Sequence, residues 1–200
     1  QIPNSHQVVV NGFITGDGGI RMSKTLGNVV DPRDIVAEFG TDALRYFLLR
    51  EVSSFEDSPF TRERFVASYN AGLANGLGNL VSRIMKMAEN MNYEFGIMNY
   101  GPEELPEEFS RHLENFEINK ACDFIWERIG EMDKFIQENQ PFKVVKTDKE
   151  KGQKMISDLV VSLYSVARML NPVLPETSEK IKSLIKENKT PEKPLFARKD

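Results

Sequence analysis

The chain has 200 residues, of which 40% are hydrophobic, and a formal net charge of −4 at pH 7. This length and composition are those of a globular chain with room for one domain or for a small domain joined to a helical bundle. The single cysteine, Cys122, excludes an internal disulfide framework and a cysteine zinc cluster, and we interpret it as a small core residue. We find neither a secretory leader nor an apolar run of about 18 residues, so we expect a cytoplasmic protein without membrane contact.

The N-terminal segment predicts one strand and a turn. Residues 7–15 carry many β-branched and aromatic side chains and predict a strand, with Asn11-Gly12 as a bulge or turn. We interpret this strand as one edge of an α/β domain whose other strands lie outside the chain. Asp17-Gly18-Gly19 predicts the turn that follows.

Two short helices are expected next. Asp31, followed by a proline, is a good N-cap, and it predicts a helix from residue 32 to residue 38 or 39. Thr41 or Asp42 is expected to cap a second helix that runs to about residue 50.

From the turn-rich segment 53–59 onward the sequence becomes nearly all helical, and we place the domain boundary there, with one domain at residues 1–56 and the other at 57–200. The apolar spacing of three and four residues predicts an up-down helical bundle, so the fold class is mainly α. Residues 92–106 predict a polar loop. The expected helices cover residues 61–91, 107–113, 118–140, 149–170 and 175–188, and residues 142–146 are expected to form a short turn of helix or a linker.

Residues 21–25, Arg21-Met22-Ser23-Lys24-Thr25, form a candidate phosphate-binding loop. Glycines on both sides let the backbone bend and approach a ligand, while hydroxyls and two cations suit the oxygens of a polyphosphate. Two basic residues three positions apart are also common in solvated loops, so this alternative stays open.

A second candidate site consists of polar and aromatic side chains on the predicted bundle. Asn75, Asn79 and Arg83 share one helix stripe and could contact an unpaired base, or they could form a solvated helix face. Phe142, beside Lys143 and Lys146, could stack on a base while these lysines contact phosphates, or it could belong to the core. Because the chain is acidic, RNA would have to be held by a few base contacts and a local cationic patch.

The stretch from Arg21 to Asp31-Pro32 resembles the Lys-Met-Ser-Lys-Ser loop of class I aminoacyl-tRNA synthetases, including the Gly-Asn and Asp-Pro that follow that loop. The resemblance implies that residues 21–25, listed above, bind ATP with Mg²⁺. It also implies that Lys24 and Arg21 act in catalysis, with Lys24 stabilising the departing pyrophosphate. Arg21 and Thr25 replace the lysine and the serine of the family motif, and arginine presents a planar fork where lysine presents a compact charge.

The rest of the chain resembles the C-terminal part of the methionyl-tRNA synthetase family. The matching segments are residues 40–45, 64–71, 77–83, 140–146 and 174–177. The resemblance implies that Asn79 and Arg83 read the methionine anticodon. It also implies that Phe142 stacks on the first anticodon base, where the family usually has tryptophan.

These resemblances imply a fragment of an enzyme that activates methionine with ATP and transfers it to tRNA. The fragment would carry the ATP-closing loop, a linking module and a bundle that binds the anticodon stem-loop. We expect the fragment alone to be inactive, because its two histidines, His6 and His112, are not in the family's His-rich motif, and no metal site is predicted. The alternatives are the corresponding part of a leucyl-, isoleucyl- or valyl-tRNA synthetase, or a non-catalytic tRNA-binding module.

Overall fold

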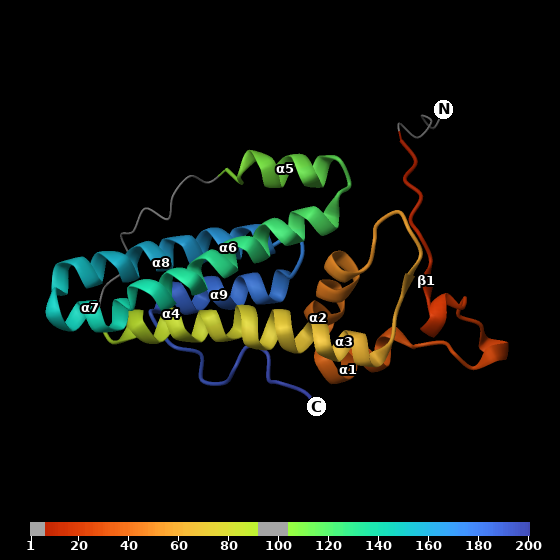
Figure 1. Ribbon diagram of the computed structural model, residues 1–200, viewed down its shortest axis with the longest axis horizontal. Coiled ribbons are helices and arrows are strands. Elements are labelled where there is room, and N and C mark those ends of the chain that lie inside the picture. The colour runs from red at the N-terminus through yellow and green to blue at the C-terminus, as the bar shows by residue number, and fades with distance from the viewer. Residues whose placement is uncertain (1–6, 92–103) are drawn as a thin grey trace.

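The computed structural model describes residues 7–91 and 104–200. The chain is mainly helical and elongated, with the N-terminal segment at one end and a helical bundle extending to the other (Figure 1). Two short strands, β1 (Ile14–Thr15) and β2 (Ser58–Pro59), pair in parallel. The helices are α1 (Pro32–Phe39), α2 (Thr41–Tyr46), α3 (Arg62–Ser68), α4 (Asn79–Glu89), α5 (Glu107–Glu114), α6 (Ile118–Asn139), α7 (Pro141–Thr147), α8 (Lys149–Leu170) and α9 (Pro175–Glu187).

The prediction of a strand over residues 7–15 is wrong for most of its length. Only its last two residues are β-structure, and they pair with β2 of this same chain. Val8 and Val10 are 78% and 77% exposed. An extended segment becomes a strand only where a neighbour satisfies its backbone groups, and β2 is just two residues long. The predicted turn is confirmed as a short 3₁₀ segment at Asp17–Gly19.

The first predicted helix is confirmed, and the predicted cap of the second is wrong. Asp31 caps α1 by accepting a hydrogen bond from the Arg33 backbone nitrogen at 2.8 Å. Gly40 is the N-cap of α2, and neither Thr41 nor Asp42 caps it. The Asp42 carboxylate is buried and accepts hydrogen bonds from the backbone nitrogen and the hydroxyl of Thr177, both at 2.7 Å. Asp42 therefore caps the distant helix α9, which has no side-chain cap of its own.

The predicted long helix over residues 61–91 is confirmed as α3 and α4 joined by a π-helical segment, Tyr69–Gly78. One glycine of this segment, Gly72, lets two neighbouring side chains come close. A Cβ atom at Gly72 would lie 1.9 Å from the Tyr46 hydroxyl oxygen, and the Trp126 indole donates a hydrogen bond to the Gly72 carbonyl at 3.2 Å. The close approach fixes α2 and α6 against this helix, and Trp126 has a packing role.

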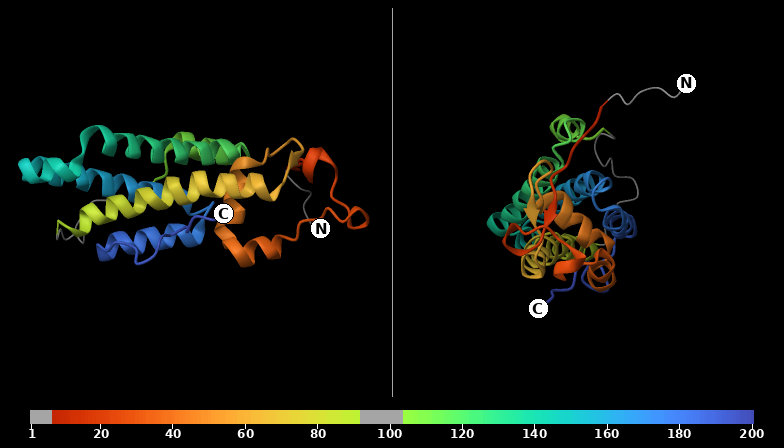
Figure 2. Two further views of the ribbon diagram at one scale, coloured as in Figure 1. Left: turned by 60° about the horizontal axis from the view of Figure 1, so that its bottom comes forward. Right: turned by 90° about the vertical axis from the view of Figure 1, so that its right-hand side faces the viewer.

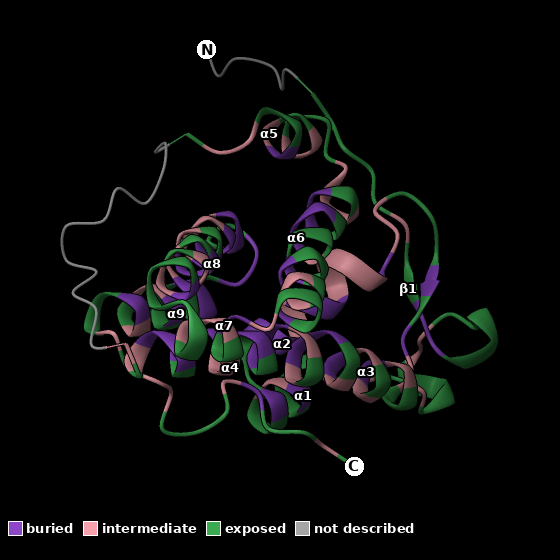
Figure 3. Ribbon diagram, turned by 60° about the vertical axis from the view of Figure 1, so that its left-hand side comes forward, coloured by how far each residue is buried: buried purple, intermediate pink, exposed green. Residues whose placement is uncertain are grey.

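The remaining helix predictions are confirmed in their described parts. Helix α4 packs against α6, α8 and α9, and the buried faces of the helices point toward one another (Figure 3). The buried side chains form one continuous cluster that reaches from α1 to the segment after α9. Phe39 and Phe65, on opposite sides of the expected boundary at 53–59, meet edge to face at 4.9 Å between ring centroids. Most of the loop predicted at 92–106 lies outside the described residues.

Helix α7 lies directly on α8 because residue 152 has no side chain. A Cβ atom at Gly152 would lie 2.3 Å from the Cα atom of Val145. We therefore predict that Gly152→Ala lowers the free energy of unfolding by roughly 1–3 kcal/mol, because the backbone of α7 must move. Urea unfolding followed by circular dichroism measures this change.

Gly130→Ala is the matched control. Gly130 lies within α6, is exposed, and has no atom within 4 Å of a Cβ built on it. Alanine should therefore leave stability unchanged or raise it by up to about 1 kcal/mol through its better helix propensity. Equal stabilities of the two variants would contradict the tight contact of α7 on α8.

Candidate nucleotide-binding loop and nucleic-acid interface

The loop of residues 21–25 is closed by the side chain of Asn28. The Asn28 amide oxygen accepts a hydrogen bond from the Ser23 backbone nitrogen at 2.8 Å, and its amide nitrogen donates to the Arg21 carbonyl at 3.3 Å. The Ser23 hydroxyl also accepts from the Thr25 backbone nitrogen at 3.3 Å. Gly27 turns the chain with a positive φ of 66°. Asn28 was not among the predicted site residues, although an Asn after a glycine is a recognisable turn signal.

The members of the loop point in different directions. Met22 is half-buried and lines a small apolar hollow of about 170 Å³ beside α1 and α2, so it anchors the loop. The Arg21 guanidinium lies over the Phe13 ring, 5.0 Å from its centroid. Lys24 and Thr25 are exposed, and Lys24 forms no ion pair with the described residues. The free ammonium group of Lys24 is thus available to an anion.

Two of the three predicted anticodon-binding residues lie at one hollow. Arg83 of α4 and Phe142 of α7 line a groove of about 470 Å³, which we call the first groove. The Arg83 guanidinium pairs with the Asp133 carboxylate of α6, which holds it at the rim. Phe142 is 43% exposed, so its ring is not part of the core, and the Lys143 ammonium lies 5.9 Å from the ring centroid. The other residues that line the first groove are Ser82, Lys86, Met87, Asn90, Ile136 and Thr190.

The third predicted residue, Asn79, does not line the first groove. It is exposed at the start of α4, one helical turn before Arg83. Asn75, which the sequence placed on the same stripe, is also exposed. The stripe therefore leads along the surface of the helix toward the groove.

A second hollow, which we call the second groove, shares Met87, Asn90 and Phe142 with the first groove. It encloses about 330 Å³ between the end of α4, α7 and the first turns of α8. Its residues come from three helices and share no motif, so the sequence reasoning named only Phe142 and Lys146 among them. The residues that line it are Met87, Asn90, Met91, Phe142, Val145, Lys146, Lys149, Gln153 and Ile156.

The two candidate sites lie at opposite ends of the molecule. In Figure 1 and in the left view of Figure 2, α7 marks one end of the bundle and the loop after β1 marks the other. The helices of the bundle fill the space between them. A ligand that contacts both sites must therefore be long.

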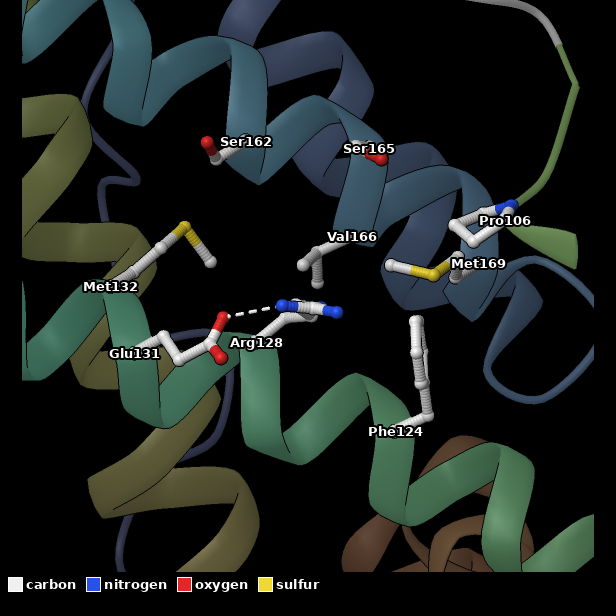
Figure 4. A pocket seen from close by; sticks show the side chains of 9 residues that line it. All are labelled: Pro106, Phe124, Arg128, Glu131, Met132, Ser162, Ser165, Val166 and Met169. Carbon is white, nitrogen blue, oxygen red and sulfur yellow. Dashed lines mark hydrogen bonds and ion pairs between the residues drawn. The ribbon is translucent and has the colours of Figure 1, made fainter. Parts of the chain in front are cut away.

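A further hollow between α6 and α8 involves none of the predicted site residues (Figure 4). Its most polar side chains satisfy each other, since Arg128 pairs with Glu131 at 2.8 Å and lies over the Phe124 ring.

Elsewhere in α6, burial raises the pKa of the Cys122 thiol to about 12, so this thiol is protonated at neutral pH and is no nucleophile.

The described part of the chain contains no group of three or more His, Cys, Asp or Glu residues that could hold a metal ion. No described helix combines the length and the apolar character needed to span a bilayer.

The comparisons with known proteins agree with one another. Residues 1–85 match the family model described as tRNA synthetases class I (M). The methionine–tRNA ligase of Clostridium acetobutylicum is 39% identical over 91% of this chain, and that of Synechocystis sp. is 34% identical over 88%. The chain spans 30% and 35% of the lengths of these two relatives.

Solved structures give the same result. The structure of Mycobacterium tuberculosis methionyl-tRNA synthetase bound by methionyl-adenylate has a TM-score of 0.72 and 30% identity, and the match covers 87% of this chain and 37% of that one. The free form of the same enzyme also has a TM-score of 0.72, with 25% identity over 95% of this chain and 43% of that one.

We predict that Asn28→Ala loosens the loop of residues 21–25. Two hydrogen bonds are lost, each worth about 0.5–1.5 kcal/mol, so local opening should become roughly tenfold more frequent. Trypsin cleavage after Arg21 and Lys24, followed by mass spectrometry, reports this opening. Asn75→Ala, at an exposed asparagine far from the loop, is the control, and an unchanged cleavage rate in Asn28→Ala would contradict the closing role of Asn28.

Proposed function

Because the chain is related to class I tRNA synthetases and is most like methionyl-tRNA synthetases, we propose that it is part of a methionine–tRNA ligase. The whole enzyme activates methionine with ATP and Mg²⁺ and transfers it to tRNA in the cytoplasm. Residues 1–56 form the end of the catalytic core with its loop and linking module, and residues 57–200 form the anticodon-binding bundle. This chain alone does not activate methionine. The observation that carries the proposal is that Arg83 and Phe142 line one groove at the end of the bundle opposite the loop.

The loop acts on the triphosphate of ATP in this proposal. Lys24 places its charge on the pyrophosphate as that group departs, where negative charge grows in the transition state. Arg21 contributes a second cation once its guanidinium leaves the Phe13 ring. Ser23 and Thr25 offer hydroxyl and backbone donors to the phosphate oxygens, while Met22 keeps the loop attached to α1 and α2. Mg²⁺ arrives with the nucleotide.

The groove at the other end binds the anticodon stem-loop. An unpaired base stacks on the exposed ring of Phe142, and the ammonium of Lys143 moves from that face to a phosphate. Arg83 donates to a second base edge, and Asp133 fixes the orientation of its planar guanidinium beforehand. Asn79, one turn away, has both a donor and an acceptor for a further edge.

We predict that Lys24→Ala in the full-length enzyme slows adenylation by roughly two or more orders of magnitude, because charge stabilisation in the transition state is lost. Methionine-dependent pyrophosphate exchange measures this step. Lys186→Ala, at an exposed lysine of α9, is the control and should exchange at the normal rate. A normal rate in Lys24→Ala would remove Lys24 from the catalytic machinery.

We predict that Phe142→Ala weakens binding of the methionine anticodon hairpin by about 1–3 kcal/mol, the usual value of one stacked base. Fluorescence anisotropy with labelled hairpins measures the affinity, and a hairpin with a scrambled loop measures the background. Phe55→Ala removes another exposed phenylalanine, which is 56% exposed and lies in the N-terminal part, and should bind normally. If Phe142→Ala instead loses helical signal, while the fraction that remains folded binds the hairpin with normal affinity, the ring has a structural role.

A further inference from the structure

We infer that Phe13 is a positioning residue for the nucleotide step. Its ring holds the Arg21 guanidinium when no nucleotide is bound, and ATP must draw the guanidinium away from the ring. This inference rests on the proposed function, in which Arg21 binds the triphosphate. It adds a residue outside the loop of residues 21–25 that sets how tightly ATP binds, and Phe13 was not predicted as a site residue.

The backbone of Phe13 is fixed by the segment around β2. Its nitrogen donates a hydrogen bond to the Asp57 carboxylate at 2.7 Å, and its carbonyl accepts one from the Ser58 backbone nitrogen at 2.9 Å. The ring itself is 58% exposed, so it contributes little to the hydrophobic core. Phe13 therefore presents an aromatic face at a defined place on the surface.

The backbone of Arg21 is held as well, whereas its side chain is exposed. The Arg21 carbonyl accepts the hydrogen bond from the Asn28 amide at 3.3 Å, and Arg21 pairs with Thr15 in an antiparallel bridge. This bridge places Arg21 beside β1, close to Phe13. The guanidinium carbon lies 5.0 Å from the centre of the ring, and the guanidinium forms no ion pair with any described residue. Rotation of the side chain alone can therefore move the charge from the ring to a ligand.

The contact between Arg21 and Phe13 competes with ATP for the same cation. A guanidinium suits this contact better than an ammonium does, because its flat face stacks on an aromatic ring. A molecule in which Arg21 lies on Phe13 has one cation fewer for the triphosphate. The affinity for ATP therefore falls as the fraction of such molecules rises. For an exposed cation–π contact, the affinity should be lowered about two- to fivefold.

The test measures the KM for ATP and kcat in methionine-dependent pyrophosphate exchange by the full-length enzyme. Phe13→Leu removes the aromatic face and keeps an apolar side chain, so the KM for ATP should fall about two- to fivefold while kcat stays the same. Arg21→Ala should raise this KM, and adding Phe13→Leu to Arg21→Ala should have no further effect, because the two side chains act as a pair. In an Arg21→Lys background the effect of Phe13→Leu should shrink, because an ammonium has no flat face to stack on the ring.

Phe55→Leu is the matched control, because Phe55 is 56% exposed in the same N-terminal part and no described cation lies over its ring. Its KM for ATP should equal that of the unchanged enzyme. An unchanged or raised KM in Phe13→Leu would overturn the inference. A fall of equal size in the Arg21→Ala background would also overturn it, because the ring would then act without the guanidinium.

The lysine of the loop separates this inference from the proposed function. Normal exchange by Lys24→Ala would overturn the proposed role of the loop, and the role of Phe13 with it. If Lys24→Ala and Arg21→Ala are both impaired while Phe13→Leu has a normal KM for ATP, the proposed function stands and the inference alone fails.

Discussion

The carboxylate of Asp42 joins the N-terminal helices to the bundle, and the placement of the two candidate sites depends on this contact. Both hydrogen bonds that Asp42 accepts come from Thr177, 135 residues away in sequence, and Asp42 is only 5% exposed. Leaving a buried hydrogen-bonding group without its partners costs about 1–3 kcal/mol, so these bonds stabilise the joint. Arg45 reinforces it through hydrogen bonds to the carbonyls of Pro172 and Val173. These contacts tie α2 to the start of α9 and to the turn before it.

The two candidate sites differ in the contacts that give them their shape. The loop of residues 21–25 owes its shape to contacts within its own segment, chiefly those of Asn28 and Met22. The grooves owe their shape to α4, α7 and α8, and the whole bundle lies between the two sites (Figure 1). Under the proposed function, any influence of the anticodon on methionine activation must pass through this bundle or through the tRNA itself.

The sequence was informative wherever the structure depends on neighbours in the chain. The helices followed from apolar spacing and from caps such as Asp31, because both act within one or two turns. The omission of Asn28 concerns a local contact, whereas the other errors and omissions depend mostly on distant residues. Asp42 lies where a local N-cap is expected in the sequence, and yet its side chain caps α9. In the described chain only residues 14 and 15 pair with another strand, and the sequence of residues 7–13 does not reveal that their partner is missing. Gly152 allows α7 to contact α8 closely, but this contact can be recognised only once the structure places Val145 against it.

Under the proposed function, the same distinction explains how an acidic chain could bind RNA. Overall charge governs long-range attraction, which salt screens within about 10 Å. Contacts at the α7–α8 junction act at shorter range, and there the lysines outnumber the acidic residues. Acidic side chains elsewhere repel the RNA backbone and so weaken non-specific binding more than binding at the grooves. An acidic body with a small cationic end thus favours an RNA whose unpaired bases reach that end. It disfavours duplex RNA that binds through its backbone alone.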